Sequence, residues 1–123
     1  MTSLKIDSYK KLIFWQRSRQ VSLSVVKLTK QLSNERPAWI ISDQIIRSCF
    51  SVGANIAEGF GKYRGKEYGR FLQMALGSAR ETEYWLELLS DIYPNLKPDI
   101  DNILLLNEET IKMLVATVRK LRN

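Results

Sequence analysis

The sequence predicts an all-α protein, an antiparallel up-down-up-down four-helix bundle in which residues 1–123 form a single domain. Four stretches repeat apolar residues at alternating spacings of three and four positions, which is the pattern of one buried face on each helix. Short segments with Gly, Pro and Asn separate these stretches. The chain has 45% hydrophobic and 26% charged residues, close to the average of globular domains.

The first helix is expected over about residues 7–32. Asp7 or Ser8 can cap its start, and the turn-forming segment 33–37, which ends in Pro37, is expected to close it. The apolar stripe of this helix consists of Phe14, Ser18, Val21, Val25, Leu28 and Leu32.

The second helix, expected from Trp39 to Glu58, carries two apolar stripes, so it should be buried on two sides. The first stripe consists of Ile41, Ile45, Cys49, Val52 and Ile56. The second consists of Ile46, Phe50, Gly53, Ala57 and Phe60. Because one stripe can face the core of the monomer and the other a second subunit, we expect a homo-oligomer with Ile46, Phe50 and Phe60 at its seam.

The remaining two helices follow a glycine-rich connection. The segment 59–65 holds three glycines and is expected to interrupt the helical pattern. The third helix should then run to about Tyr93, where Pro94 stops it. The fourth is expected from beyond Pro98 to the end of the chain. Their stripes are Phe71, Ala75, Ser78, Thr82, Leu86, Leu89, and Ile100, Leu104, Asn107, Ile111, Leu114, Val118, Leu121.

The composition argues against an enzyme. With 0 His, the chain lacks the commonest general base, the Ser/His and Cys/His nucleophile pairs and most zinc sites. Its 1 Cys, Cys49, cannot form an intramolecular disulfide, and its position in an apolar stripe indicates a buried thiol. We expect a cytosolic protein with no cofactor, no metal and no membrane segment.

The charge points to a polyanionic partner. The chain has 19 Lys+Arg against 13 Asp+Glu, which gives a formal charge of +6. Residues 1–36 carry 8 basic and 2 acidic side chains, and residues 37–66 carry 4 and 2. Residues 67–93 carry 2 and 5, and the last stretch carries 5 and 4. We therefore place the positive potential on the first helix and on the connection between the second and third.

The candidate nucleic-acid-binding residues come mainly from these two regions. The connection interleaves charges with aromatic rings, which suits phosphate pairing and base stacking on unpaired RNA. The alternative is a solvated loop whose tyrosines pack on the bundle, and most helical lysines only aid solubility. The candidates are Lys62, Tyr63, Arg64, Lys66 and Arg70 of the connection, Lys10, Lys11, Arg17 and Lys27 of the first helix, and Arg47 of the second.

A second polar cluster has two interpretations. Carboxylates on neighbouring helices could hold a pair of metal ions, but di-iron bundles also use Glu-x-x-His pairs, and this chain has no His. The favoured interpretation is a structural hydrogen-bond network between the second and third helices. Its members would be Asn55, Glu58, Ser78, Glu81 and Glu83.

Two strings carry a family resemblance: residues 39–62, and residues 67–86. The most specific parts are Asn55-Ile56-Ala57-Glu58-Gly59 and Gly77-Ser78. With weaker matches near Phe14 and Met113, the chain resembles the four-helix-bundle proteins encoded in intervening sequences of bacterial 23S ribosomal RNA. It is also similar in architecture to the accessory variability determinant proteins of diversity-generating retroelements.

The resemblance implies a pentameric, barrel-like ring with basic surfaces that binds nucleic acid. The retroelement branch implies a partner reverse transcriptase and its template RNA. Two positions depart from the first family's pattern: Ile46 precedes Arg47 where relatives usually have two consecutive basic residues, and Gly53 stands in place of a proline. The first departure puts in doubt any RNA contact at that site.

Three functions remain open at this point. The leading one is a non-enzymatic, homo-oligomeric RNA-binding protein, with DNA as the other nucleic acid that the charge would suit. The second is a protein-interaction scaffold, such as a retroelement accessory protein that binds a reverse transcriptase together with RNA. An enzyme that acts through Glu and Lys alone is the third, and no spacing signature supports it.

Overall fold

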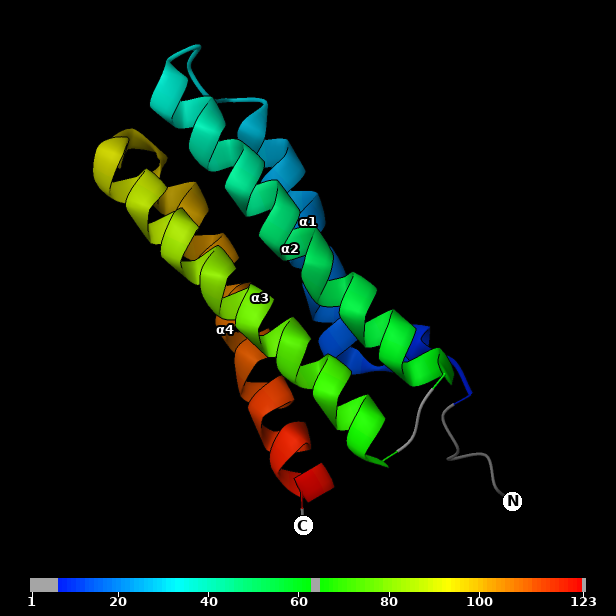
Figure 1. Ribbon diagram of the computed structural model, residues 1–123. Helices are drawn as coiled ribbons and strands as arrows, with labels where there is room; N and C mark the ends of the chain where they lie inside the picture. Colours follow the sequence, from blue (N-terminus) through cyan, green and yellow to red (C-terminus); the bar gives the residue numbers. More distant parts are fainter. Residues whose placement is uncertain (1–6, 63–64, 123) are drawn as a thin grey trace.

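The computed structural model describes residues 7–62 and 65–122 and confirms the all-α bundle (Figure 1). Four long helices dominate it: α1 (Ile13–Thr29), α2 (Arg36–Lys62), α3 (Gly65–Ile92) and α4 (Lys97–Arg122). Two short 3₁₀ turns, η1 (Tyr9–Lys11) and η2 (Pro94–Leu96), precede α1 and α4. Neighbouring helices run in opposite directions, and α1 packs on both α2 and α4 while α3 packs on both α2 and α4.

The start of the first helix differs from the prediction. Ser8 caps η1, since its hydroxyl accepts a hydrogen bond from the Lys10 N–H at 3.2 Å. Leu12 then takes an extended conformation, with φ −73° and ψ 127°, so that α1 begins only at Ile13. A turn and a helix therefore replace the continuous helix expected from residue 7.

Pro37 belongs to a different element from the one that the sequence predicts. It lies in the first turn of α2, which begins at Arg36, rather than in the turn that ends the first helix. Proline suits this position because the first turn of a helix needs no N–H donor from it and its fixed φ is already helical. The helix that was expected from Trp39 thus starts earlier.

The predicted break at residue 59 is wrong, because α2 continues to Lys62. Gly59 is buried inside this helix, and a Cβ atom there would lie 2.5 Å from Cβ of Phe71 on α3. The glycine therefore permits close approach of two helices and does not form a turn. Gly65 begins α3.

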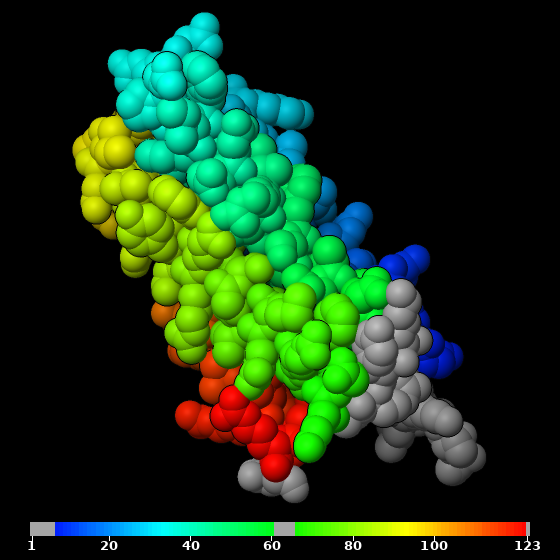
Figure 2. Space-filling model, viewed as in Figure 1, coloured from blue at the N-terminus to red at the C-terminus, as the bar shows by residue number. Residues whose placement is uncertain are grey.

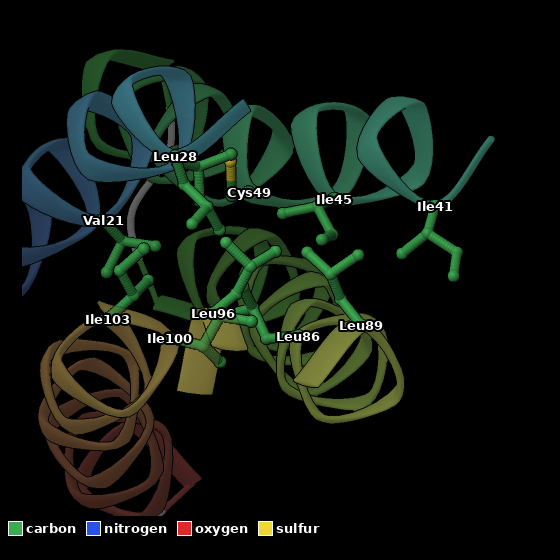
Figure 3. Packing of buried hydrophobic residues seen from close by; sticks show 11 residues of the cluster. Val21, Leu28, Ile41, Ile45, Cys49, Leu86, Leu89, Leu96, Ile100 and Ile103 are labelled. Carbon is green, nitrogen blue, oxygen red and sulfur yellow. The ribbon is translucent and has the colours of Figure 1, made fainter. Parts of the chain in front are cut away.

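The core follows the predicted stripes closely. It consists of two clusters, one toward each end of the bundle, to which all four helices contribute. Figure 3 shows the first, where Val21 and Leu28 of α1 face Ile45 and Cys49 of α2 together with residues of α3 and α4. Two stripe residues are exposed: Phe50, at 48%, on the second stripe of α2, and Leu121, at 37%, at the end of α4.

Candidate nucleic-acid interface

One end of the bundle gathers basic side chains from segments that are far apart in the sequence. There α3 begins, α4 ends, and η1 lies beside the last part of α2 (Figure 1). Figure 2 shows the last turn of α4, in red, against the first turns of α3, in green. We call this region the basic end, and its described basic residues are Lys10, Lys11, Lys66, Arg70, Arg119, Lys120 and Arg122.

Ion pairs of Asp7 and Glu67 lie at the basic end, which also carries Glu58 near the end of α2. Asp7 pairs with Lys11 at 3.0 Å, and the hydrogen bond and charge of that lysine hold the pKa of the Asp7 carboxyl below its usual value. Glu67 lies 3.9 Å from Arg70. Both pairs are exposed to solvent, which screens them, so a phosphate could readily replace either carboxylate.

The last turn of α4 supplies the most concentrated charge. Arg119, Lys120 and Arg122 lie where the helix dipole is negative, which favours cations there. None of the three forms an ion pair with another residue in the described ranges. Their charges are therefore available to a polyanion.

Two other candidate residues have internal carboxylate partners. Nε of Arg17 on α1 donates to Glu109 of α4 at 2.8 Å. Arg47 of α2 pairs with Glu81 of α3 and also donates to the Gln44 side chain at 2.9 Å. Both arginines lie on the sides of the bundle and link neighbouring helices.

The remaining candidates are divided between the far end and the connection. Lys27 is exposed near the end of α1, where it lines a shallow pocket with Asp99 of α4. Tyr63 and Arg64, and the side chain of Lys62, lie outside the described residues. Of the ten candidates, the structure thus places Lys10, Lys11, Lys66 and Arg70 at one end of the molecule.

The predicted seam residues have different environments. Phe50 is 48% exposed, whereas Ile46 packs against the first core cluster and Phe60 packs edge-on against Tyr68, with ring centroids 6.0 Å apart. Phe50 borders a groove of about 430 Å³ between α1 and α2. The aromatic rings of Tyr9 and Trp15 and the small residues Gly53, Ala54 and Ala57 complete much of its lining.

Polar side chains link α2 to α3. Nδ2 of Asn55 donates to the Ser51 hydroxyl at 3.0 Å, and that hydroxyl lies 2.9 Å from the hydroxyl of Ser78. One step along the helices, the fully buried hydroxyls of Ser48 and Thr82 are 2.8 Å apart. The structure therefore joins Asn55 to Ser78 through Ser51, a residue that the sequence analysis missed.

The three carboxylates predicted for this network have different environments. Glu81 accepts from Nε1 of Trp85 at 2.9 Å in addition to Arg47. Glu58 is exposed and Glu83 is half-buried. Every buried side-chain nitrogen or oxygen in the described part of the chain has a hydrogen-bond partner.

The buried cysteine and the arrangement of the carboxylates bear on catalytic and metal chemistry. Cys49 is 1% exposed, and burial raises the pKa of its thiol to about 11, so the thiol is protonated at neutral pH. Within residues 7–62 and 65–122, no group of three or more Cys, Asp or Glu side chains is arranged to hold a metal ion. No helix in these ranges is long and apolar enough to cross a membrane.

Comparison with known proteins identifies the family to which the chain belongs. Residues 10–116 match the family described as 23S rRNA-intervening sequence protein. The chain belongs to this family. A comparison with curated proteins gives no match.

A solved structure supports the same membership. The chain is similar to a crystal structure of a protein with unknown function from the S23 ribosomal protein family of Bacteroides thetaiotaomicron, with 33% sequence identity and a TM-score of 0.77. The similarity covers 85% of this chain and 97% of the other. The family name links the 23S rRNA-intervening sequence proteins to ribosomal RNA, and the kinship with retroelement accessory proteins stays a prediction.

Proposed function

We propose that this 23S rRNA-intervening sequence protein is a non-enzymatic, homo-oligomeric RNA-binding protein that contacts RNA through its basic end. The observation that carries the proposal is the convergence of two helix termini, the first turns of α3 and the last turn of α4. These turns together hold five cations, Lys66, Arg70, Arg119, Lys120 and Arg122, and one carboxylate, that of Glu67. Phosphates are the ligands that such a cluster of exposed cations attracts most strongly.

Internal pairing sharpens this assignment. The ion pairs Arg17–Glu109 and Arg47–Glu81 satisfy cations on the sides of the bundle with protein carboxylates. At the opposite end, Lys97 pairs with Asp101 at 3.0 Å. The other cations of that end, Lys27, Lys30 and Arg36, lie among the carboxylates of Glu35, Asp91 and Asp99. The excess of positive charge is therefore larger at the basic end, and binding there would depend on charge more than on base identity.

Self-association would multiply a weak site. Phe50 is the most exposed of the predicted seam residues, and the groove beside it also has the aromatic rings of Tyr9 and Trp15, a residue type that is enriched in subunit contacts. Light scattering should report a mass several times 14.3 kDa. Phe50→Asp should lower that mass without unfolding the bundle, since the ring contributes little to the core. A wild-type monomer at micromolar concentration would contradict this part of the proposal.

Salt dependence of single-stranded RNA binding tests the proposal as a whole. The triple variant Lys66→Gln, Arg70→Gln, Arg122→Gln should reduce the slope of log affinity against log salt by about 2, at roughly 0.7 per lost phosphate contact. The control Lys27→Gln, Lys30→Gln, Arg36→Gln removes the same charge from the opposite end and should leave the slope unchanged.

The outcomes separate the alternatives. If the control variant and the basic-end variant lose affinity for RNA equally, binding depends on the net charge of the protein and not on a site at the basic end. If duplex DNA binds as tightly as single-stranded RNA, the proposal that RNA is the ligand is wrong. If the wild-type protein binds no RNA at low salt, the protein-interaction scaffold predicted as the alternative replaces this proposal.

A further inference from the structure

The basic end also contains a pocket. It lies between the first turns of α3 and the last turn of α4 and has a volume of about 410 Å³, within the range of about 300–1,000 Å³ typical of small-molecule sites. Lys66 and Arg70 line it from α3, and Arg122 lines it from α4. Three cations thus border one concave surface.

The lining is apolar between these cations. Val118 and Leu121 of α4 contribute aliphatic surface, and Gly69 of α3 exposes its backbone because it has no side chain. A Cβ atom at Gly69 would lie 3.8 Å from Leu121, which is ordinary van der Waals distance, so packing of the two helices does not require glycine there. The missing side chain enlarges the pocket and has no other evident role in the helix contact.

An apolar depression ringed by cations matches the chemistry of a nucleotide. A base is flat and apolar on its faces, and it stacks on guanidinium planes such as those of Arg70 and Arg122 as well as on aromatic rings. Its phosphate requires cations a short distance from the base. Gln73, which also lines the pocket, can both donate to and accept from a base edge.

We propose that this pocket binds one unpaired nucleotide of the RNA, an inference that rests on the function proposed above. The base occupies the surface formed by Gly69, Val118 and Leu121, and Lys66, Arg70 and Arg122 pair with the adjacent phosphates. Duplex RNA cannot fill the pocket because its bases are stacked and paired. The basic end therefore distinguishes strands with unpaired nucleotides from continuous duplex.

A matched pair of glycine substitutions on α3 tests the pocket. Gly69→Leu fills it, whereas Gly77→Leu adds the same side chain where a Cβ atom would meet nothing within 4 Å. The probes are a short oligouridylate, the same oligouridylate paired with oligoadenylate, and uridine monophosphate as a competitor, all at low salt.

We expect Gly69→Leu to bind the single strand about tenfold more weakly than wild type, with unchanged affinity for the duplex. Gly77→Leu should bind both as wild type does. Should Gly69→Leu fail to fold, Gly69→Ala narrows the pocket by one methyl at an unstrained distance and should give a smaller loss of the same kind.

Three results overturn the inference in different ways. If the wild-type protein binds the single strand but both leucine variants match it, RNA binds at the basic end without entering the pocket. If uridine monophosphate competes as tightly as the strand, the ligand is a free nucleotide. If the wild-type protein binds neither the single strand nor the duplex, the proposed function itself is wrong. That result comes from the wild-type protein alone and does not depend on the variants.

Discussion

Gly59→Ala should destabilise the protein even though alanine favours helices. Gly59 is buried in α2, and an added Cβ atom would lie 2.5 Å from Cβ and 3.1 Å from Cγ of Phe71 on α3. Because Cβ is fixed to the backbone, the two helices must separate to relieve the overlap. Overpacking of this kind costs about 1–3 kcal/mol.

Gly77→Ala is the matched control for this experiment. Gly77 is exposed on α3, and a Cβ atom there meets nothing within 4 Å, so the variant should gain about 0.5–1 kcal/mol from helix propensity. Both glycines lie inside helices and both substitutions gain this propensity, so urea unfolding should separate the two variants by about 1–3 kcal/mol, the cost of the overlap. The measurement needs one protein concentration, because self-association makes apparent stability concentration-dependent. A Gly59→Ala protein at least as stable as wild type would refute the idea that this glycine exists for close packing.

Four further predictions follow from individual contacts. Burial raises the pKa of the Cys49 thiol from 9.0 to about 11. The free energy of unfolding should therefore be fully retained below pH 9 and should fall as the pH rises to 11. Urea titrations at several pH values should show this fall for wild type and not for Cys49→Ala. Asn107→Ala should cost about 1–3 kcal/mol by thermal or urea unfolding, because its buried amide donates to the Ala79 carbonyl at 2.9 Å. Arg47→Gln should leave the salt slope of RNA binding unchanged, since its charge already pairs with Glu81. EDTA should not change the melting temperature, and a loss of several degrees would reveal a metal site.

The fold could be predicted largely because apolar periodicity determines which face of each helix is buried. The stripe from Ile41 to Ile56 is buried at every position, and so is the stripe from Phe14 to Leu28. Termini were harder to predict, since Pro37 and Gly59 have two meanings in a sequence. Proline can end one helix or begin the next, and glycine can form a turn or permit close packing. Only the neighbouring helix decides between them.

The candidate site was harder to predict because its charges converge only in three dimensions. The last stretch of the chain carries 5 basic and 4 acidic residues and looks nearly neutral. Its carboxylates precede its final turn, however, and Arg119, Lys120 and Arg122 all lie in that turn. Arg17 and Arg47 were candidates on charge alone, and a sequence does not show that Glu109 and Glu81 lie opposite them. The sequence signal that could have indicated this site is the cluster of three basic residues in the last turn of the fourth helix.

Self-association and RNA binding make one joint prediction. The groove beside Phe50 runs along the sides of α1 and α2, away from the last turn of α4. In a cyclic oligomer formed through such lateral contacts, every copy presents its basic end on the same face of the ring. A long RNA could then contact several subunits at once, with an affinity that exceeds the single-site value by about a hundredfold or more.

Phe50→Asp separates the two contributions. If this variant is monomeric, its affinity for an RNA just long enough to cover one basic end should equal that of wild type, because the site lies on one subunit. Its affinity for an RNA long enough to span the ring should fall by about a hundredfold. Equal losses for the short and the long RNA would mean that each binding site is built from two subunits, and the assignment of the interface to a single basic end would then be wrong.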